Sequence, residues 1–523
     1  MLLTLLLLPL AAVLLLCLAP LPGPWPRRVA VFAPAVQLLM LLWLAGHPVP
    51  ELRQVWLPQL GLELHLGLDG LSLPLAGLTA LLSFMAVFAT PISQPRRRFF
   101  YAMVLATNVG LTGAFLACNG LLFVLAYEIT LIPTTLLVAV WGGERRATAA
   151  IRYLMYGAVS GMALLAGVLA LALLNRNGFS FAYADMAQAV LPEGAERWIL
   201  ALLLLAFGLK MPIFPLHGWQ PLTYSQASTP VAMQLAGVVS KLGAYGLLRF
   251  GIGMLGDTWA EWSPWIAVVG MVSALYGALN AIAQTDMRRL VAFSALGHMG
   301  LLVLALAAAT PLSLQGAIAQ ILAQGMIVAL LFCLVGKIEA KTGTTEIAAL
   351  SGLMNPSRGL PFTLGLLLLA LMAAAGVPGQ AGFLAEMVVF QGSWPVFPLP
   401  TIGCILASGL TAVYAVRLFN RVGFGRLDNK TADYVSTTWV ERLPALALSF
   451  LVILAGLWPQ ILLGWSEDTT SALALSRPPI NALAMAAPSP ALPTLATLPS
   501  LTTPAFHAPL APLHLPTSLA LRP

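Results

Sequence analysis

Charged residues are scarce in this 523-residue chain, in which 9% are Asp, Glu, Lys or Arg and 59% are hydrophobic. The mean hydropathy is correspondingly high, at +0.89. A chain with so little charge cannot cover a water-soluble globule, so the composition predicts a polytopic membrane protein. Basic residues in such a chain usually report membrane topology, so the net charge of +7 predicts no nucleic-acid partner.

Cysteine is also rare, and its placement argues against a metal or redox centre. The four cysteines all lie in apolar runs, without CxxC spacing and without paired histidines: Cys17, Cys118, Cys333 and Cys404. Iron–sulfur, zinc and haem sites normally need such spacing. We therefore expect no metal and no cofactor in this chain.

Long apolar runs are abundant and define the fold class. Runs of about 18 or more residues give about 14 predicted transmembrane helices. Their centres fall near residues 10, 38, 82, 108, 130, 162, 204, 240, 272, 299, 325, 370, 410 and 453. The first run lacks a basic n-region and is long enough to span, so we interpret it as a helix and not as a signal peptide. The fold is predicted to be all-α and membrane-embedded.

Basic residues give the expected orientation. Most of the 26 Lys and Arg residues fall in loops that follow odd-numbered helices, which predicts that these loops are cytoplasmic and that both termini face the opposite side. Residues 466–523 are rich in Pro, Ala, Ser and Thr. Because frequent proline blocks helix and sheet, we expect a disordered or polyproline-like tail there.

Four charges stand inside the predicted spans: Glu128, Lys210, Lys241 and Glu386. A charge near the bilayer centre costs about 3 kcal/mol or more, so it is usually kept for a function. Static ion pairs that position helices are one interpretation. Four charges on four helices, with His298 nearby, favour a proton or ion path, in which a buried lysine carries protons well. A single intramembrane histidine is more often a packing residue.

Two of the predicted spans are interrupted. Pro212 and Pro215 in LKMPIFPLHGW follow Lys210 and must break its helix, because proline removes a backbone donor. The second interruption, before Glu386, contains Gly376, Pro378, Gly379 and Gly382. Paired broken helices are typical of inverted-repeat transporters, in which they line the ion path. Two ordinary proline kinks would be the alternative.

Four segments resemble one family, the antiporter-like subunits of respiratory complex I and specifically their M or D type. They are AYEITLIP (126–133), the run from LKMPIFPLHGW to GAYGLLRF (209–250), TDMRRLVAFSALGHMG (285–300) and GVPGQAGFLAE (376–386). The resemblance extends to about residue 465. It implies 14 helices with two inverted five-helix repeats containing broken helices. The implied divisions are helices 1–3 in 1–98, repeats in 99–251 and 252–425, and a loop with helix 14 in 426–465.

The family's site residues can be carried over by position. The resemblance implies that Glu128 and Lys210 form a coupling ion pair, that Lys241 is the central proton relay and that Glu386 is the terminal one. Ser294 and His298 fall in the second relay helix.

Two departures from the family stand out. WQPLTY (219–224) replaces a run that usually holds an acid and a histidine, and Gln324 stands where a histidine is usual. An amide cannot titrate, so water or another route must replace that station.

Shorter segments are similar to one branch, the D-type subunit of cyanobacterial photosynthetic complex I in its CO2-uptake variant. They are SGLMNPSRGLP (351–361), AEMVVFQGSWPVFPLPTIGC (385–404) and LFNRVGFGRLDN (418–429). This similarity implies a thylakoid location, neighbouring antiporter-like subunits and a CO2-hydration partner on the cytoplasmic side. It also implies electron transfer from ferredoxin or NAD(P)H to plastoquinone, with plastoquinone and iron–sulfur clusters held by partner subunits.

Other functions remain open from the sequence. The respiratory or cyclic-flow form shares the intramembrane charges, and a Na⁺/H⁺ antiporter subunit would use the same Lys and Glu chemistry. A membrane scaffold whose proton path has decayed is a third alternative. Gln324 and the WQPLTY run favour this last interpretation.

Overall fold

The computed structural model describes residues 1–47, 49–427, 434 and 437–475, and the described residues belong to one compact unit. Most of the predicted tail, residues 476–523, lies outside the described residues. Its first residues instead form a helix, α21 (Glu467–Leu475). That stretch, EDTTSALAL, contains no proline, so the argument from proline does not apply to it.

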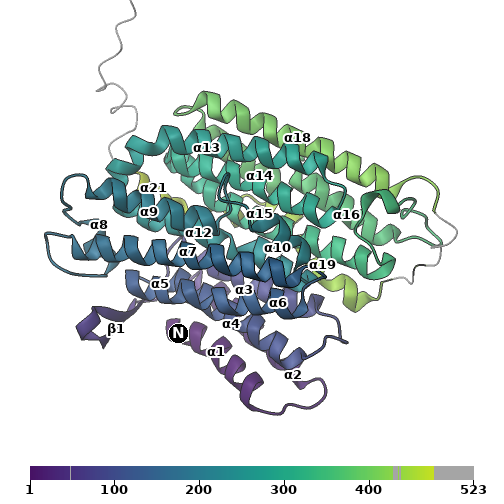
Figure 1. The fold of residues 1–523 in the computed structure, drawn as a ribbon, viewed down its shortest axis with the longest axis horizontal. Helices are drawn as coiled ribbons and strands as arrows, with labels where there is room; N and C mark the ends of the chain where they lie inside the picture. The colour runs from purple at the N-terminus through teal and green to yellow at the C-terminus, as the bar shows by residue number, and fades with distance from the viewer. Residues whose placement is uncertain (48, 428–433, 435–436, 476–523) are drawn as a thin grey trace, which may run out of the picture. The chain divides into compact units, whose positions relative to one another are not determined.

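Helices dominate the chain from its first residues onward (Figure 1). The N-terminal part contains α1 (Leu2–Leu18), α2 (Trp25–Leu44), β1 (Leu52–Leu57), η1 (Pro58–Leu60), β2 (Leu62–Leu66), α3 (Ser72–Ala89), α4 (Arg97–Leu116), α5 (Gly120–Ile129), α6 (Leu131–Trp141), α7 (Arg146–Leu173) and α8 (Tyr183–Ala187). The middle part contains α9 (Ala195–Lys210), α10 (Gln220–Gln226), α11 (Thr229–Gln234), η2 (Leu235–Val239), α12 (Lys241–Gly246), η3 (Leu247–Ile252), α13 (Gly256–Ala283), α14 (Met287–Ala308) and α15 (Pro311–Thr342). The C-terminal part contains η4 (Ile347–Ala349), α16 (Pro361–Ala374), α17 (Ala381–Ser393), α18 (Pro398–Gly423), α19 (Trp439–Leu457), α20 (Gln460–Leu463) and α21.

The all-α membrane fold is confirmed. Eleven helical stretches among the described residues are long and apolar enough to span a membrane, among them the continuous stretch Thr229–Ile252 from α11 to η3. Twelve of the predicted centres lie in a helix, and the other two, at residues 130 and 240, fall on single-residue junctions inside the Gly120–Trp141 and Thr229–Ile252 spans. The difference from 14 has a physical reason: α1 is one residue short of the 18-residue length, and two predicted spans are each split into shorter helices, α9 with α10 and α16 with α17.

A small hairpin interrupts the helices near the N-terminus. β1 pairs antiparallel with β2 between α2 and α3, with Leu52 opposite Leu66. The sequence analysis did not predict it, because the two strands are short and lie beside long apolar runs that dominate the pattern. The hairpin lies at the edge of the ribbon near α5 (Figure 1).

Three spans form the interior. The most apolar windows of α14, α15 and the Thr229–Ile252 span are completely buried. Helices that are apolar on all sides are stable in the middle of a bundle. By contrast, α2, α7, α13, α18 and α19 keep less than half of their windows buried, and they expose apolar side chains as a lipid-facing layer would.

Glycines let helices touch backbone to backbone, both among the central spans and between α13 and α14. A Cβ built at Gly237 would lie 3.2 Å from the carbonyl oxygen of Gly325, and one built at Gly277 would lie 2.3 Å from the amide nitrogen of Gly297. Small residues at such contacts are typical of membrane helix packing. The first contact presses the Lys241 span against α15.

Candidate functional site

Lys210 ends α9 and is buried, with only 4% of its surface exposed. Its Nζ donates a hydrogen bond of 2.9 Å to Thr130 Oγ1 and lies 4.5 Å from the centre of the Tyr127 ring. The expected ion pair with Glu128 is not formed, since among the described residues no carboxylate pairs directly with Lys210. The buried cation is therefore held by a hydroxyl and an aromatic face.

Glu128 lies near the C-terminal end of α5, beside the residues that hold Lys210. Its Oε1 is buried without a hydrogen-bond partner among the described residues. The carboxylate rests on the backbone of α7, where a Cβ at Gly161 would lie 1.7 Å from Oε1. Gly161 thus makes room for an unpaired carboxylate. The sequence analysis missed Gly161, and also Thr130 and Tyr127, because only folding brings α5, α7 and α9 together.

The first helix break lies directly after Lys210. α9 ends there, and Pro212 and Pro215 lie in the irregular segment before α10. The peptide bond before Pro215 is cis. Trp219 Nε1 donates to the carbonyl oxygen of Leu209 at 2.8 Å, which satisfies one of the acceptors freed at the helix end.

Lys241 begins α12 directly after a π-helical segment, η2. Its side chain is fully buried, and Nζ donates to the carbonyl oxygen of Ala236 at 2.5 Å. Among the described residues it forms no ion pair. π-helical turns are frequent at functional sites. The neighbouring helix α15 carries Gln320, whose two amide atoms are buried and lack partners among the described residues.

His298 and Glu386 meet directly. His298 Nδ1 on α14 lies 3.3 Å from Glu386 Oε1 on α17, and both side chains are buried. The same nitrogen lies 3.2 Å from Gln324 Nε2 on α15. Ser408 on α18 donates to Glu386 Oε2 at 2.6 Å. The contact of His298 with Glu386 is close without hydrogen-bond geometry, which leaves Oε1 without a hydrogen-bond donor in the described part of the chain.

The second helix break lies against this cluster. Gly376 and Gly379, on either side of Pro378, adopt positive φ angles of 69° and 87°, a conformation that favours glycine. A Cβ at Gly376 would lie 3.0 Å from Glu386 Oε2. The break between α16 and α17 therefore brings backbone close to the carboxylate.

Two further groups extend the polar interior. Ser294, one turn before His298 on α14, accepts a hydrogen bond of 2.6 Å from the Tyr414 hydroxyl. In the WQPLTY run, Gln220 Nε2 donates to the carbonyl oxygen of Ala292 at 2.7 Å. Gln220, at the start of α10, thus binds to the backbone of α14 through its amide.

Arg249 in η3 forms an ion pair that the sequence does not reveal, because its partner Asp69 is 180 residues away along the chain. Its Nη2 lies 2.6 Å from Asp69 Oδ2, and its Nε donates to the Tyr245 hydroxyl at 2.9 Å. Tyr245 in turn donates to the carbonyl oxygen of Phe115. Burial raises the pKa of Asp69, but Arg249 and the hydrogen bonds from Ser72 outweigh it and hold that pKa below its ordinary value.

Arg288 forms the second missed ion pair, at the start of α14. It pairs with Glu339 at 2.5 Å and donates to the carbonyl oxygen of Ala227 and to Thr229 Oγ1. Only 6% of its surface is exposed, so it ties α14 and α15 to the start of α11.

Comparison with known proteins gives one consistent result. Residues 117–411 match a family described as NADH:quinone oxidoreductase/Mrp antiporter, transmembrane. The chain is 35% identical over 436 residues to NAD(P)H-quinone oxidoreductase chain 4 1 of Synechococcus sp. (strain JA-2-3B'a(2-13)), with 81% of each chain covered. It is 32% identical over 467 residues to NADH-quinone oxidoreductase subunit M of Escherichia coli (strain K12), covering 85% of this chain and 91% of that one.

Solved structures agree. A chain of respiratory complex I from Thermus thermophilus with bound NADH superposes with a TM-score of 0.83 at 28% identity, covering 91% of this chain and 99% of that one. A chain of the Mrp complex from Dietzia sp. DQ12-45-1b shares the fold, with a TM-score of 0.81 at 21% identity and with 92% and 98% covered.

Proposed function

We propose, from the premise that this chain belongs to the NADH:quinone oxidoreductase/Mrp antiporter family as an antiporter-like membrane-arm subunit of complex I, that its buried charges carry protons across the membrane. The partners of such a subunit are the other membrane-arm subunits of its complex. Glu128, Lys210, Lys241, His298 and Glu386 are the proposed carriers.

One observation carries this proposal: the two buried lysines are held by neutral groups. Lys210 donates to a threonine hydroxyl and Lys241 to a backbone carbonyl. A structural ion pair would match each cation with a carboxylate, because an unpaired buried charge is costly. A lysine with a neutral partner can lose its proton without leaving an unpaired carboxylate buried beside it.

In the first predicted repeat, residues 99–251, we assign the change of protonation that drives transport to Glu128 and Lys210. Glu128, whose Oε1 is unpaired, belongs to the turn Tyr127–Thr130 at the end of α5. The ammonium of Lys210 contacts the same turn through Thr130 and the Tyr127 ring. Opposite charges that approach one another stabilise each other's charged forms. A small displacement of α5 against the end of α9 would therefore change whether Lys210 holds its proton.

In the second predicted repeat, residues 252–425, we assign proton transfer to His298 and Glu386. Imidazole and carboxylate can exchange a proton when a small rotation brings Nδ1 and Oε1 into hydrogen-bond geometry. Gln324 orients the imidazole, and Gln320, one turn away on the same helix, offers water two amide atoms that lack partners among the described residues. Two amides and water would thus span the region between the lysine and the histidine.

The experiment is proton uptake into proteoliposomes that contain the assembled complex, driven by quinone reduction. Glu386→Gln keeps the size of the side chain and removes its charge, and it is expected to reduce proton uptake at least about tenfold. Glu441→Gln is the matched control, because Glu441 caps α19 and is half exposed. Equal uptake in the two variants would contradict the proposal. Uptake that depends on sodium would instead favour a Na⁺/H⁺ antiporter.

We further propose that the complex is the CO2-uptake form of photosynthetic complex I, which passes electrons from ferredoxin or NAD(P)H to plastoquinone in the thylakoid membrane. The support is the similarity of the segments 351–361, 385–404 and 418–429 to that branch, together with the cyanobacterial chain 4 relatives. Mass spectrometry of the intact complex from mildly solubilised membranes tests it. A CO2-hydration subunit is the expected finding, and a respiratory or cyclic-flow set of subunits would refute this assignment.

A further inference from the structure

Three segments that are far apart in the sequence meet next to the β1–β2 hairpin. Glu51 directly precedes β1, His65 lies in β2, and Cys118 lies in the turn between α4 and α5. A backbone hydrogen bond holds Cys118 beside His65, because Cys118 N donates to the carbonyl oxygen of His65 at 2.9 Å. The neighbouring residues Leu66 and Ala117 form an isolated β-bridge. The hairpin is thereby fastened to the start of α5.

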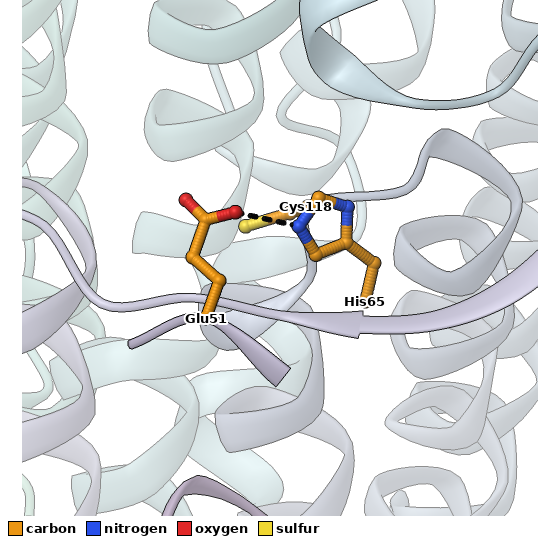
Figure 2. Close-up of side chains that lie close together, drawn as sticks. All are labelled: Glu51, His65 and Cys118. Carbon is orange, nitrogen blue, oxygen red and sulfur yellow. Dashed lines mark hydrogen bonds and ion pairs between the residues drawn. The ribbon is translucent and has the colours of Figure 1, made fainter. Parts of the chain in front are cut away.

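The side chains of these three residues converge (Figure 2). One ligand atom of each, the Glu51 carboxylate oxygen, the His65 ring nitrogen and the Cys118 Sγ, lies within 4.8 Å of the others. His65 Nε2 and Glu51 Oε2 are 2.7 Å apart. Among the described residues, the thiol makes a single long hydrogen-bond contact, of 3.9 Å, with the carbonyl oxygen of Leu116.

Gly67 leaves space for the Cys118 thiol because it has no side chain. A Cβ at Gly67 would lie 2.7 Å from Cys118 Sγ, so any side chain there would push the thiol away, and it would touch Glu51 Cγ at 3.4 Å. A surface ion pair between Glu51 and His65 would not need this space. The absence of a side chain at Gly67 is what allows all three donors to share one centre.

We propose that Glu51, His65 and Cys118 bind a zinc ion. Imidazole nitrogen, thiolate sulfur and carboxylate oxygen are the donors that zinc prefers. Bond lengths of about 2.0–2.3 Å place tetrahedral ligands roughly 3.5 Å apart. Glu51 is 64% exposed in its side chain and is free to swing away from His65 Nε2, which opens their short contact to this spacing.

The donor set also defines the kind of site. Three protein ligands leave the fourth position of a tetrahedral zinc ion open to water. The ion would clamp the hairpin to the turn that begins α5, and α5 carries Glu128 at its other end. The sequence predicted no zinc because spacing along the chain cannot reveal donors that three separate segments contribute.

The test is zinc binding by the full-length chain in detergent, washed with a chelator and titrated with Zn²⁺ against a chromophoric zinc indicator. We expect one bound ion per chain. Cys118→Ser is expected to weaken binding at least about tenfold, and Gly67→Ala is expected to weaken it with all three ligands still present. Cys17→Ser is the matched control, because Cys17 is an exposed cysteine of α1.

Cobalt gives an independent readout of the sulfur ligand. With Co²⁺ in place of zinc, the wild type and Cys17→Ser are expected to show a thiolate-to-metal absorption band that Cys118→Ser lacks. Zinc affinity in Cys118→Ser equal to that in Cys17→Ser would overturn the proposal. If Cys118→Ser elutes as aggregate, Glu51→Gln replaces it, since this exposed position can change without disturbing the core. Unchanged affinity in Glu51→Gln would overturn the proposal equally.

Discussion

At the scale of single residues, Gln324 decides how protons would reach His298. Its amide contacts the histidine and cannot titrate, so it can only orient the imidazole and bind water. We expect Gln324→Leu to reduce proton uptake about tenfold or more, because His298 Nδ1 loses a polar neighbour and water loses its anchor. Gln324→His keeps a polar contact and is expected to retain uptake. The measurement is proton uptake by the reconstituted complex, normalised to quinone reduction.

Two outcomes would contradict this role. Equal uptake in Gln324→Leu and the wild type would mean that protons bypass α15. Loss of uptake in both variants would mean that the site requires the shape of glutamine and not its polarity.

The sequence predicted the charged residues of the site but not their partners. Glu128, Lys210, Lys241 and Glu386 stand out because charge inside an apolar run is costly. Thr130, Gly161 and Ser408 do not stand out, because hydroxyl and glycine residues are common in membrane helices. The pairing of Lys210 with Glu128 was expected from their opposite charges and from the family resemblance, and the structure instead places the ammonium on Thr130.

At the scale of elements, the break between α16 and α17 holds Glu386 in place. Gly376→Ala is expected to destabilise the protein, because its positive φ angle costs a side chain about 1–2 kcal/mol. The new Cβ would also lie 3.0 Å from the Glu386 carboxylate. We expect a lower melting temperature together with reduced proton uptake.

Gly379→Ala is the matched control for that change. Gly379 has a positive φ angle of 87°, but a Cβ there would meet nothing within 4 Å. It should lower the melting temperature similarly and leave uptake per quinone reduced unchanged. Equal uptake in the two variants would show that contact with Glu386 has no functional importance.

Elements were predicted well where one physical signal dominated. Apolar length predicted the spans, and proline with glycine predicted where α9 and α16 end. The β1–β2 hairpin and the π-helical turns around Lys241 were missed. They depend on contacts with α4, α5 and α15, which no local pattern encodes.

At the scale of the whole molecule, the ion pair of Asp69 with Arg249 joins the start of α3 to the Thr229–Ile252 span. The pKa of Asp69 is below its ordinary value in the folded protein. A carboxylate with a lowered pKa adds stability that is present above the unfolded pKa of about 3.9 and is lost as the pH falls through the folded value. We therefore expect the melting temperature to fall below about pH 4, with a smaller acid-dependent fall in Asp69→Asn.

Glu63→Gln is the control for this pH dependence. Glu63 pairs with Arg53 on the exposed hairpin, and exposed ion pairs contribute about 0–1 kcal/mol. Its removal should leave the acid-dependent fall nearly unchanged. Identical pH profiles for the wild type and Asp69→Asn would contradict a structural role for the Asp69 pair.

The central claim is that protons cross the membrane through Lys241, which is buried in the Thr229–Ile252 span. The most direct measurement is the number of protons moved per electron by the assembled complex with Lys241→Ala, compared with Lys341→Ala in the last turn of α15, where Lys341 pairs with the half-exposed Glu441. We predict a clear fall in this ratio for Lys241→Ala and the wild-type ratio for Lys341→Ala. An unchanged ratio in a fully assembled Lys241→Ala complex would contradict the account and favour a scaffold without a proton path.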